Sequence, residues 1–243
     1  MRIIKQIKER MKAIPFFMGC YNLYFKLRFG QRIKRKRNYF LRENKELFYE
    51  FTRILNENNI VFWLEFGTLL GYYREHDFIK HDYDLDVGAY LSDSAAIRKC
   101  LTENGFKLVR DFHAKDGGIE ECYRFLHTTI DVFYFRTDEN NSSLHYCELF
   151  KAPVFPIKKK HLNKELLMTV RRKEVPNNGF ERAVFKNCNV YIPKRADEYL
   201  SYHYGKSFMI PDPNFNPDNY LDHTKYYSYE ENPGTGIFYE LPL

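Results

Sequence analysis

The spacing of apolar residues changes from helical to strand-like within the first third of the chain. In ENKELFYEFTRILNENN, residues 43–59, apolar side chains recur at helical spacing with polar side chains opposite, which predicts an amphipathic helix. The run IVFWLEF, residues 60–66, is rich in β-branched and aromatic residues and ends at Gly67. We therefore expect a buried strand and a tight turn, followed by a short helix over residues 69–74.

Turn and cap residues divide the next part of the chain into short elements. We expect a strand over YDLDVGAY and then a helix over SDSAAIRKCLTENG, because that segment opens on cap-type residues and closes on Gly105. Gly117-Gly118 is a hairpin signal. Strands are expected on both sides of it and once more before a loop at 137–143; the three strand segments are 106–113, 120–127 and 129–135.

The C-terminal third has a weaker pattern. One more strand is expected near residues 183–192 and a helix over 195–204, while the Pro- and Tyr-rich tail is assigned no regular structure. Strands and helices thus alternate irregularly along one chain. This order predicts an α+β (mixed α/β) fold, in which helices flank a mixed sheet.

Charge separates a basic N-terminal extension from a mildly acidic body. Residues 1–42 contain 13 Lys and Arg against one Glu, a net charge of +12, so residues 43–243 carry −6 of the total +6. We expect two parts, a basic amphipathic extension at 1–42 and a catalytic domain at 43–243. The acidic body and the absence of RNA-binding motifs argue against a nucleic-acid partner.

Cysteine usage and apolar runs indicate a cytoplasmic protein. The five cysteines are scattered and never form a CxxC pair, so neither a disulfide framework nor a zinc site is expected. The longest apolar stretch, residues 14–25, is shorter than the roughly 20 residues needed to span a bilayer. No A-x-A-like cleavage site follows it.

Three aspartates two positions apart in the run DYDLDVGAY, residues 82–90, carry the candidate chemistry. On a strand, Asp82, Asp84 and Asp86 would share one face, opposite a face of apolar residues. Asp131 stands alone in the apolar run TIDVFYF and would lie within about 5 Å of Asp84 or Asp86 if the two strands are neighbours. The alternative is that Asp82 and Asp84 belong to a solvated turn and that only Asp86 begins the strand.

A divalent cation would relieve the repulsion between these carboxylates. Carboxylate oxygens suit Mg²⁺, which also keeps phosphate oxygens in its coordination shell, so the acidic face points to phosphoryl chemistry. Upstream, Gly67 ends the buried strand and Thr68 opens a helix. Backbone N–H groups and a hydroxyl at a helix N-terminus can hold a phosphate.

Combined, these motifs resemble the nucleotidyltransferase superfamily. Within it, WLEFGTLLGYYREHDFIKHDYDLDVG, residues 63–88, resembles the LicD and fukutin families, whose usual form is an aromatic-rich strand, GTLLG, an Arg and FIPWD-x-D-x-D. A fainter similarity runs through Asp131 and YIPKRADEYLSYHYGKSFMIPDP, so that residues 45–220 are covered. Lys80-His81 replaces the common Pro-Trp, which leaves the role of His81 open.

The resemblance implies a nucleotidyltransferase-like sheet and transfer of a phospho-alcohol group, such as phosphocholine, ribitol phosphate or glycerol phosphate. The donor would be CDP-activated and the acceptor a sugar hydroxyl of a cell-surface glycan, which can be lipid-linked. By this analogy Asp84 and Asp86 hold Mg²⁺ or Mn²⁺, and Asp131 completes the cluster or helps deprotonate the acceptor. Asp82 is an outer ligand or an alternative base. The implied substrate-binding residues are Gly67, Thr68, Arg74 and His81, although an ion pair with Glu75 or Asp77 is the alternative role for Arg74.

Three functions remain open on the sequence. The favoured one is a CDP-dependent phosphotransferase acting on a bacterial capsule, lipopolysaccharide or teichoic-type glycan, which would release CMP. The second is a nucleotidyltransferase that releases pyrophosphate, and the third is a catalytically inactive scaffold or membrane adaptor.

The N-terminal extension favours a location at a membrane surface. Its apolar and aromatic middle is flanked by basic clusters, as in an interfacial anchor on an anionic leaflet. We expect a peripheral protein at the inner face of the cytoplasmic membrane. The alternative is a basic helix that packs on the domain or mediates self-association.

Overall fold

The computed structural model of the chain describes residues 15–152, 157–212, 224–228 and 230–241, with side chains from residue 30 onward except at 224–226. The elements, in chain order, are α2 (Pro15–Glu57), β1 (Phe62–Leu64), α3 (Phe66–Glu75), β2 (Asp84–Tyr90), η1 (Leu91–Asp93), α4 (Ser94–Glu103), β3 (Lys107–Ala114), β4 (Ile119–Phe125), β5 (Thr128–Thr137), β6 (Leu144–Lys151), η2 (Lys159–His161), β7 (Glu165–Pro176), β8 (Phe180–Phe185), β9 (Cys188–Pro193), α5 (Ala196–Tyr204), β10 (Thr224–Tyr226) and β11 (Gly234–Phe238).

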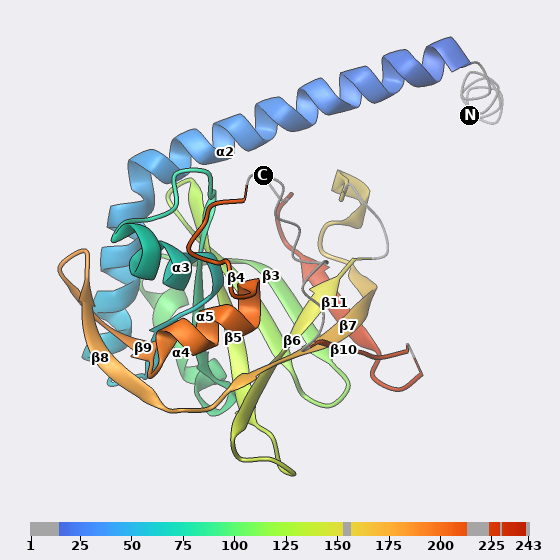
Figure 1. Ribbon diagram of the computed structural model, residues 1–243. Helices are drawn as coiled ribbons and strands as arrows, with labels where there is room; N and C mark the ends of the chain where they lie inside the picture. Colours follow the sequence, from blue (N-terminus) through green and yellow to red (C-terminus); the bar gives the residue numbers. More distant parts are fainter. Residues whose placement is uncertain (1–14, 153–156, 213–223, 229, 242–243) are drawn as a thin grey trace.

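Within the described residues, eleven strands form one mixed sheet (Figure 1). Its order is β10-β7-β11-β3-β4-β5-β2-β1-β9-β8, and β6 pairs with both β5 and β7, which closes a ring of six strands. Two pairings are parallel, β2 with β5 and β1 with β9, and the others are antiparallel. The prediction of an α+β fold with a mixed sheet is therefore confirmed.

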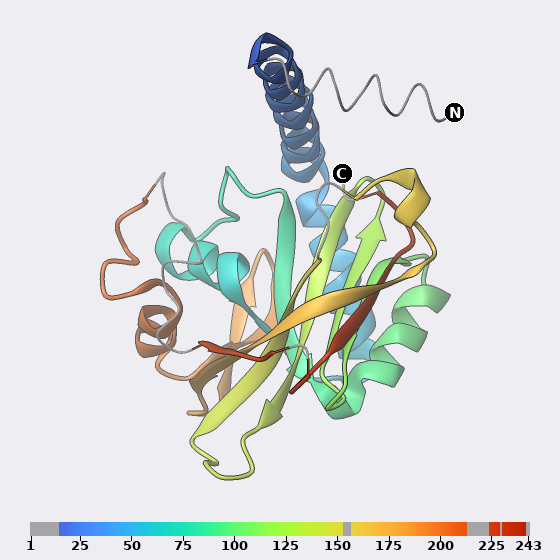
Figure 2. The ribbon, with the colours of Figure 1, turned by 90° about the vertical axis from the view of Figure 1, so that its right-hand side faces the viewer.

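Helices cover both faces of the sheet. Figure 2 shows α4 and the C-terminal half of α2 on one face, and α3 and α5 on the other. The apolar positions expected on one face of the helix within 43–59 are all buried in the main core; these are Leu47, Phe48, Phe51, Ile54 and Leu55. Because this face packs on the sheet, the helical period in the sequence locates the core.

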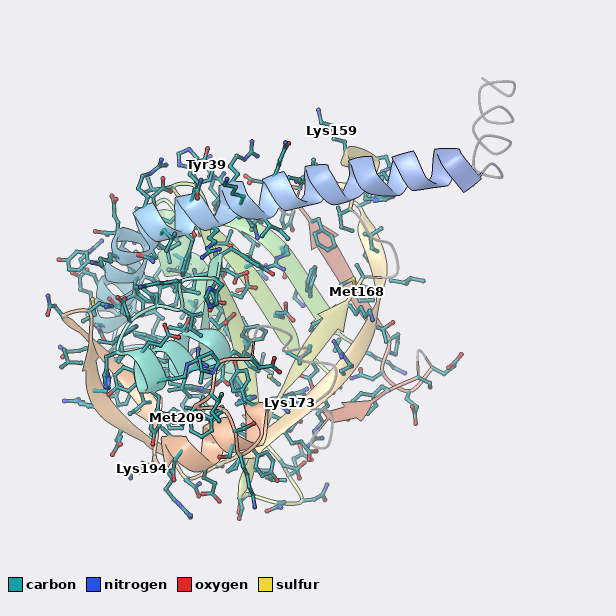
Figure 3. The ribbon with its side chains drawn as sticks, turned by 45° about the horizontal axis from the view of Figure 1, so that its top comes forward. Tyr39, Lys159, Met168, Lys173, Lys194 and Met209 are labelled. Atoms are coloured by element: carbon teal, nitrogen blue, oxygen red, sulfur yellow. The ribbon has the colours of Figure 1, made fainter. Side chains whose placement is uncertain are left out.

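Helix α2 is longer than the sequence pattern predicted. It begins at Pro15 and passes residue 42 without a break, and its N-terminal part extends beyond the sheet (Figure 1). Phe40 is buried, and Tyr39, labelled in Figure 3, stacks on His127 with ring centroids 4.6 Å apart. The division at residue 42 stays a prediction, and residues 1–14 lie outside the described part. No helix that the structure describes is long and apolar enough to cross a membrane.

The expected elements between residues 60 and 137 are confirmed with small shifts of their ends, and α5 is found where a helix was expected. The single strand predicted near 183–192 is wrong, because β8 and β9 form a hairpin there. Its turn residues Lys186 and Asn187 both have positive φ, 51° and 64°. Two central residues with positive φ are typical of a two-residue hairpin loop, because this turn matches the twist of the flanking strands.

Four further strands, β6, β7, β10 and β11, were not anticipated. Three consecutive basic residues, Arg171 to Lys173, interrupt the apolar pattern of β7, and β11 begins with Gly-Thr-Gly. Neither sequence has the alternation typical of a strand. Tertiary pairing creates these strands, since β11 lies between β3 and β7.

Trp63 on β1 packs directly over Gly88 of β2. The two residues are register partners, and a Cβ added to Gly88 would lie 2.3 Å from two atoms of the indole. The indole is fully buried, stacks on Phe180 with centroids 4.1 Å apart, and donates a 2.8 Å hydrogen bond from Nε1 to Glu65. Glycine is therefore required at position 88, two residues after Asp86 on the same strand, for this close packing.

A methyl group at this position is expected to destabilise the protein. Gly88→Ala should lower the free energy of unfolding by about 1–3 kcal/mol, because the buried indole must move. The matched control is Gly30→Ala in an exposed part of α2, where an added Cβ meets nothing within 4 Å. That change should raise helix stability by up to about 1 kcal/mol. Urea denaturation measures both, and a Gly88→Ala protein as stable as wild type would contradict the packing described here.

Candidate active site

Strand β2 places two of the three clustered aspartates on one face. Asp84 begins the strand and Asp86 follows two positions later, both half-buried, while Leu85 and Val87 are buried on the opposite face. Asp82 lies just before the strand, in the loop that follows α3. The alternation predicted from the sequence therefore begins at Asp84.

Strand β5 brings the fourth carboxylate to the same face. Its parallel register with β2 pairs Asp86 with Asp131 and Asp84 with Thr129. Adjacent strands lie about 4.8 Å apart, so Asp86 and Asp131 stand side by side. The sequence expectation that these two strands are neighbours is confirmed.

Burial and mutual repulsion raise the pKa values of the clustered carboxylates. The pKa of Asp84 is raised to about 7, first by burial and then by the charge of Asp131. The pKa of Asp86 is raised well above its usual range by burial and by Asp84 and Asp131. The pKa of Asp82 rises to about 6, through burial and the nearby Glu75. The site thus brings several carboxylates together where burial removes the water that would stabilise their charged forms.

Gly67 and Thr68, at the start of α3, hold Asp86 in place. The Gly67 N–H donates to Oδ2 of Asp86 at 3.2 Å, and the Thr68 hydroxyl oxygen accepts the backbone N–H of Asp86 at 2.8 Å. A Cβ at Gly67 would lie 2.8 Å from Oδ2 of Asp82 and 3.3 Å from Oδ2 of Asp86. Glycine therefore lets two carboxylates approach the helix N-terminus, where the helix dipole favours negative charge. A phosphate-binding role for Gly67 and Thr68 stays a prediction.

The turn between β1 and α3 is held by residues that sequence reasoning missed. Phe66 has a φ of 39°, which is uncommon for a bulky residue, and its ring packs on Phe133 and His203. Glu65 is fully buried and accepts hydrogen bonds from Trp63 at 2.8 Å and Tyr199 at 2.7 Å, with His203 Nε2 at 2.9 Å. Helix α5 is thereby attached to the turn that carries Gly67. The sequence did contain a signal for this contact, because Glu65 is a charged residue within the apolar run IVFWLEF and must therefore have a buried partner.

Arg110 on β3 is the second residue that sequence reasoning missed. Its Nη2 donates to both oxygens of Asp131, at 2.6 and 2.7 Å. The register explains the contact, because Cys122 of β4 pairs with Asp131 on one side and with Arg110 on the other. Burial alone would lower the pKa of Arg110, but the charge of Asp131 raises it well above its usual range.

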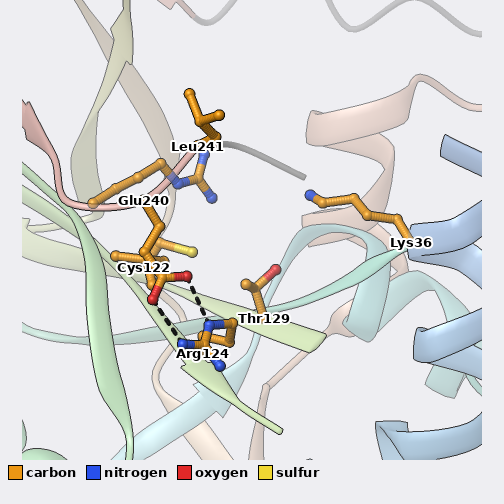
Figure 4. A pocket seen from close by; sticks show the side chains of 8 residues that line it. Lys36, Cys122, Arg124, Thr129, Glu240 and Leu241 are labelled. Atoms are coloured by element: carbon orange, nitrogen blue, oxygen red, sulfur yellow. Dashed lines mark hydrogen bonds and ion pairs between the residues drawn. The ribbon is translucent and has the colours of Figure 1, made fainter. Parts of the chain in front are cut away.

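A small cavity beside Arg110 is lined partly by basic side chains. It has a volume of about 40 Å³ and is lined by Lys36, Val109, Arg110, Cys122, Arg124, Thr129, Glu240 and Leu241. Figure 4 shows Lys36, from α2, facing Thr129 across this space, and Arg124 bonded to Glu240 at 2.8 and 2.7 Å. The positive charge of Lys36 acts against the raised pKa of Asp84.

Arg74 and His81 lie at the edge of the cluster. Arg74 forms an ion pair with Glu75 at 2.7 Å and donates to the carbonyl of Phe208 at 3.3 Å, while its charge still opposes the raised pKa of Asp82. This is the ion pair weighed as the alternative role. His81 is exposed in the loop before β2. The substrate contacts predicted for both residues stay predictions.

The carboxylates fit a hard divalent cation by their chemistry. Asp84 and Asp86 offer oxygen ligands on one face, and burial and mutual repulsion raise their pKa values, which a cation bound there would offset. Asp131 is turned to Arg110, and in the part of the chain that the structure describes no three acidic, imidazole or thiol groups form a ready metal cluster. Asp84 and Asp86 would therefore hold the ion first. The three-ligand set with Asp131 stays a prediction.

Neutralising Asp84 is expected to stabilise the metal-free protein at neutral pH. The pKa of Asp84 is about 7 in the folded protein and 3.8 for the free group. The folded protein therefore gains stability from protonation of Asp84, fully below about pH 4, and loses this gain as the pH rises through 7. Asp84→Asn does not undergo this loss. In EDTA at pH 8 it should exceed wild type by on the order of 1 kcal/mol in urea denaturation, with the difference shrinking toward pH 4.

Glu103→Gln on the exposed surface of α4 is the control and should follow wild type at every pH. An Asp84→Asn protein that is less stable than wild type at pH 8 would contradict the electrostatic description.

Comparison with known proteins assigns the chain to a family. Residues 59–195, more than half of the chain, match the model of the LicD/FKTN/FKRP nucleotidyltransferase domain. The chain is 26% identical over 174 residues to the ribitol-5-phosphate transferase FKTN of Homo sapiens and 24% to that of Mus musculus, covering 71% of this chain and 34% of each relative. It thus spans about a third of the length of these relatives.

Two other likenesses are more limited. An uncharacterized protein of Rickettsia prowazekii (strain Madrid E) is 36% identical over 95 residues, 39% of this chain and 34% of that protein. Among solved structures, the lincomycin-bound lincosamide antibiotic adenylyltransferase LnuA aligns with a TM-score of 0.41 at 11% identity, over 68% of this chain and 94% of that one. The family match covers β1, α3, β2 and β5, the elements that place Gly67, Asp84, Asp86 and Asp131, and the chain belongs to the LicD/FKTN/FKRP family.

Proposed function

We propose that this protein is a Mg²⁺- or Mn²⁺-dependent phosphotransferase with a nucleotidyltransferase-type sheet. It moves a phospho-alcohol group from a CDP-activated donor to a sugar hydroxyl of a cell-surface glycan and releases CMP. The FKTN relatives are named ribitol-5-phosphate transferases. Ribitol phosphate is therefore one candidate for the group transferred, beside phosphocholine and glycerol phosphate.

One observation carries the proposal most directly. Asp84, Asp86 and Asp131 stand on one face of two parallel strands, next to the N-terminus of α3. Three carboxylates on a single face repel each other, and this repulsion adds to burial in raising the pKa values of Asp84 and Asp86, which a structural role does not require. A site for a divalent cation and a diphosphate gives this charge a use.

The chain's own residues divide the reaction between them. Asp84 and Asp86 hold the divalent cation, which supplies positive charge against the donor diphosphate. The hydroxyl oxygen of the acceptor attacks the phosphorus atom that carries the alcohol. The bond between this phosphorus and the oxygen that leaves with CMP breaks, and Asp82 accepts the proton of the acceptor hydroxyl. A pKa of about 6 suits Asp82 to that task near neutral pH. We assign the proton to Asp82 and not to Asp131, because both oxygens of Asp131 accept hydrogen bonds from Arg110.

Substrate contacts fall to the residues around this cluster. The N-terminus of α3 lies beside the carboxylates, since the Gly67 N–H bonds to Asp86, and helix N-termini of this kind bind phosphate oxygens. Arg74 adds positive charge beside Asp82, and His81 stands in the loop at the edge of the site. His81 is exposed, whereas Arg74 and Gly67 are partly buried and Thr68 is buried. Because a glycan acceptor must enter from solvent, we assign His81 to the acceptor side of the site.

Donor-dependent release of CMP tests this proposal. Purified protein with Mg²⁺ is incubated separately with CDP-ribitol, CDP-choline and CDP-glycerol and a glycan acceptor, and CMP is quantified. Asp84→Asn and Asp86→Asn should each lower kcat by about 10²-fold or more, because charge stabilisation in the transition state is lost. The control Glu103→Gln changes a charge at the exposed end of α4 and should have the kcat of wild type.

Two results would contradict the proposal. Pyrophosphate release from a nucleoside triphosphate, without CMP release from any CDP-alcohol, identifies a nucleotidyltransferase instead. Absence of both products in wild type, with Asp84→Asn indistinguishable from it in every assay, identifies an inactive scaffold or adaptor.

We further propose that the basic N-terminal segment binds an anionic membrane surface at the cytoplasmic side, where a lipid-linked acceptor would be found. Residues 1–42 carry a net charge of +12, and the N-terminal part of α2 extends beyond the sheet (Figure 1). Lys34 and Arg35 on this helix are exposed. Each basic residue near such a surface contributes about 1 kcal/mol.

Vesicle sedimentation tests the membrane proposal. Wild type should bind vesicles containing anionic phospholipid and release them at high salt, with little binding to neutral phosphatidylcholine. Lys34→Gln combined with Arg35→Gln should weaken binding by about tenfold or more. The control is Lys99→Gln with Lys194→Gln, an equal charge change at exposed positions on the body. Equal binding of both double variants, or salt-resistant binding to neutral vesicles, would contradict an electrostatic anchor.

A further inference from the structure

Arg110 and Asp131 form a direct charge pair inside the site. The same nitrogen, Nη2, lies 2.6 Å from one carboxylate oxygen and 2.7 Å from the other. Both oxygens of Asp131 therefore face the guanidinium. A divalent cation bound by Asp131 would have to share these oxygens with Arg110 or displace it.

The pair belongs to the architecture of the sheet. Arg110 and Asp131 are two strands apart in one cross-strand row through Cys122, next to Asp86. Their side chains are only 24% and 10% exposed, so solvent screens their attraction weakly. In such surroundings a fixed positive charge within a few ångströms strongly opposes the binding of a second cation.

The cavity beside Arg110 is a place where a bound phosphate could become a second partner for the guanidinium. Arg110 and Lys36 both line this space, and Arg124, which also lines it, is already bonded through two nitrogens to Glu240. Lys36 lies over the ring of Tyr83, 4.7 Å from its centroid, and it approaches from α2, outside the sheet. Two basic side chains that line one cavity, with Arg110 bonded to Asp131, suit a phosphate group, which an arginine can bind through two parallel hydrogen bonds.

We propose that Arg110 exchanges partners during substrate binding. In the free protein it holds Asp131, and when Asp131 joins Asp84 and Asp86 around a divalent cation, Arg110 turns to a phosphate of the nucleoside diphosphate donor. This inference rests on the proposed function. It makes Arg110 a positioning residue that couples metal and donor, so that each strengthens the binding of the other.

The first experiment measures metal binding without substrate. Mn²⁺ is titrated into the full-length protein and free Mn²⁺ is followed by electron paramagnetic resonance. Arg110→Gln should bind Mn²⁺ about tenfold tighter than wild type, because a competing positive charge is removed. Arg182→Gln, an equal charge change on the exposed strand β8, should stay within about twofold of wild type.

The second experiment measures binding of CDP at saturating Mg²⁺ by calorimetry. Arg110→Gln should bind CDP about tenfold more weakly than wild type, because the phosphate loses a charged partner. Arg110→Lys keeps the charge without the planar fork and should bind Mn²⁺ like wild type and CDP with intermediate affinity. Arg182→Gln should again match wild type.

Tighter Mn²⁺ binding together with weaker CDP binding supports the exchange. Weaker binding of both ligands means that Arg110 only maintains the site, and unchanged binding of both means that it is an ordinary ion pair; either overturns the inference. If Arg110→Gln does not fold, Arg110→Lys decides, and wild-type affinity for CDP overturns the exchange. If wild type binds Mn²⁺ but no CDP, the proposed donor is wrong, and the Mn²⁺ titration still decides the role of Arg110.

Discussion

The repulsion between Asp86 and Asp131, side by side on parallel strands, is the constraint to which the rest of the site responds. Three neighbouring groups offset part of this charge. The Gly67 amide bonds to Asp86, Arg110 reaches Asp131 from two strands away, and Lys36 arrives from a helix outside the sheet. Even so, the pKa values of Asp84 and Asp86 remain raised. The arrangement costs stability that a packed apolar face would not, which is typical of a site kept for chemistry.

Local periodicity predicted the parts of the site that depend on local geometry. Because side chains alternate along a strand, the sequence was sufficient to place Asp84 and Asp86 on one face and Leu85 and Val87 in the core. The apolar run around Asp131 likewise indicated a buried strand. The amphipathic pattern of residues 43–59 identified the helix that covers the opposite face of the sheet.

Contacts between distant segments could not be read from periodicity. Arg110 and Asp131 are 21 positions apart, and Glu65 and Tyr199 are 134 apart, so only the strand order and the helix packing bring them together. A charged residue in an apolar strand signals that a partner exists without saying which one. For the same reason β11 was missed, because its short Gly-containing sequence becomes a strand only between β3 and β7.

Helix α2 has a mechanical consequence for the site. It is unbroken from Pro15 to Glu57, and Lys36 stands about 30 Å from its first residue at 1.5 Å per residue. Beyond Lys36 the helix is locked onto the sheet by Phe40 and the buried residues that follow. A displacement of the N-terminal part of α2 would therefore also move the Lys36 amine, whose charge acts on Asp84 in the acidic cluster.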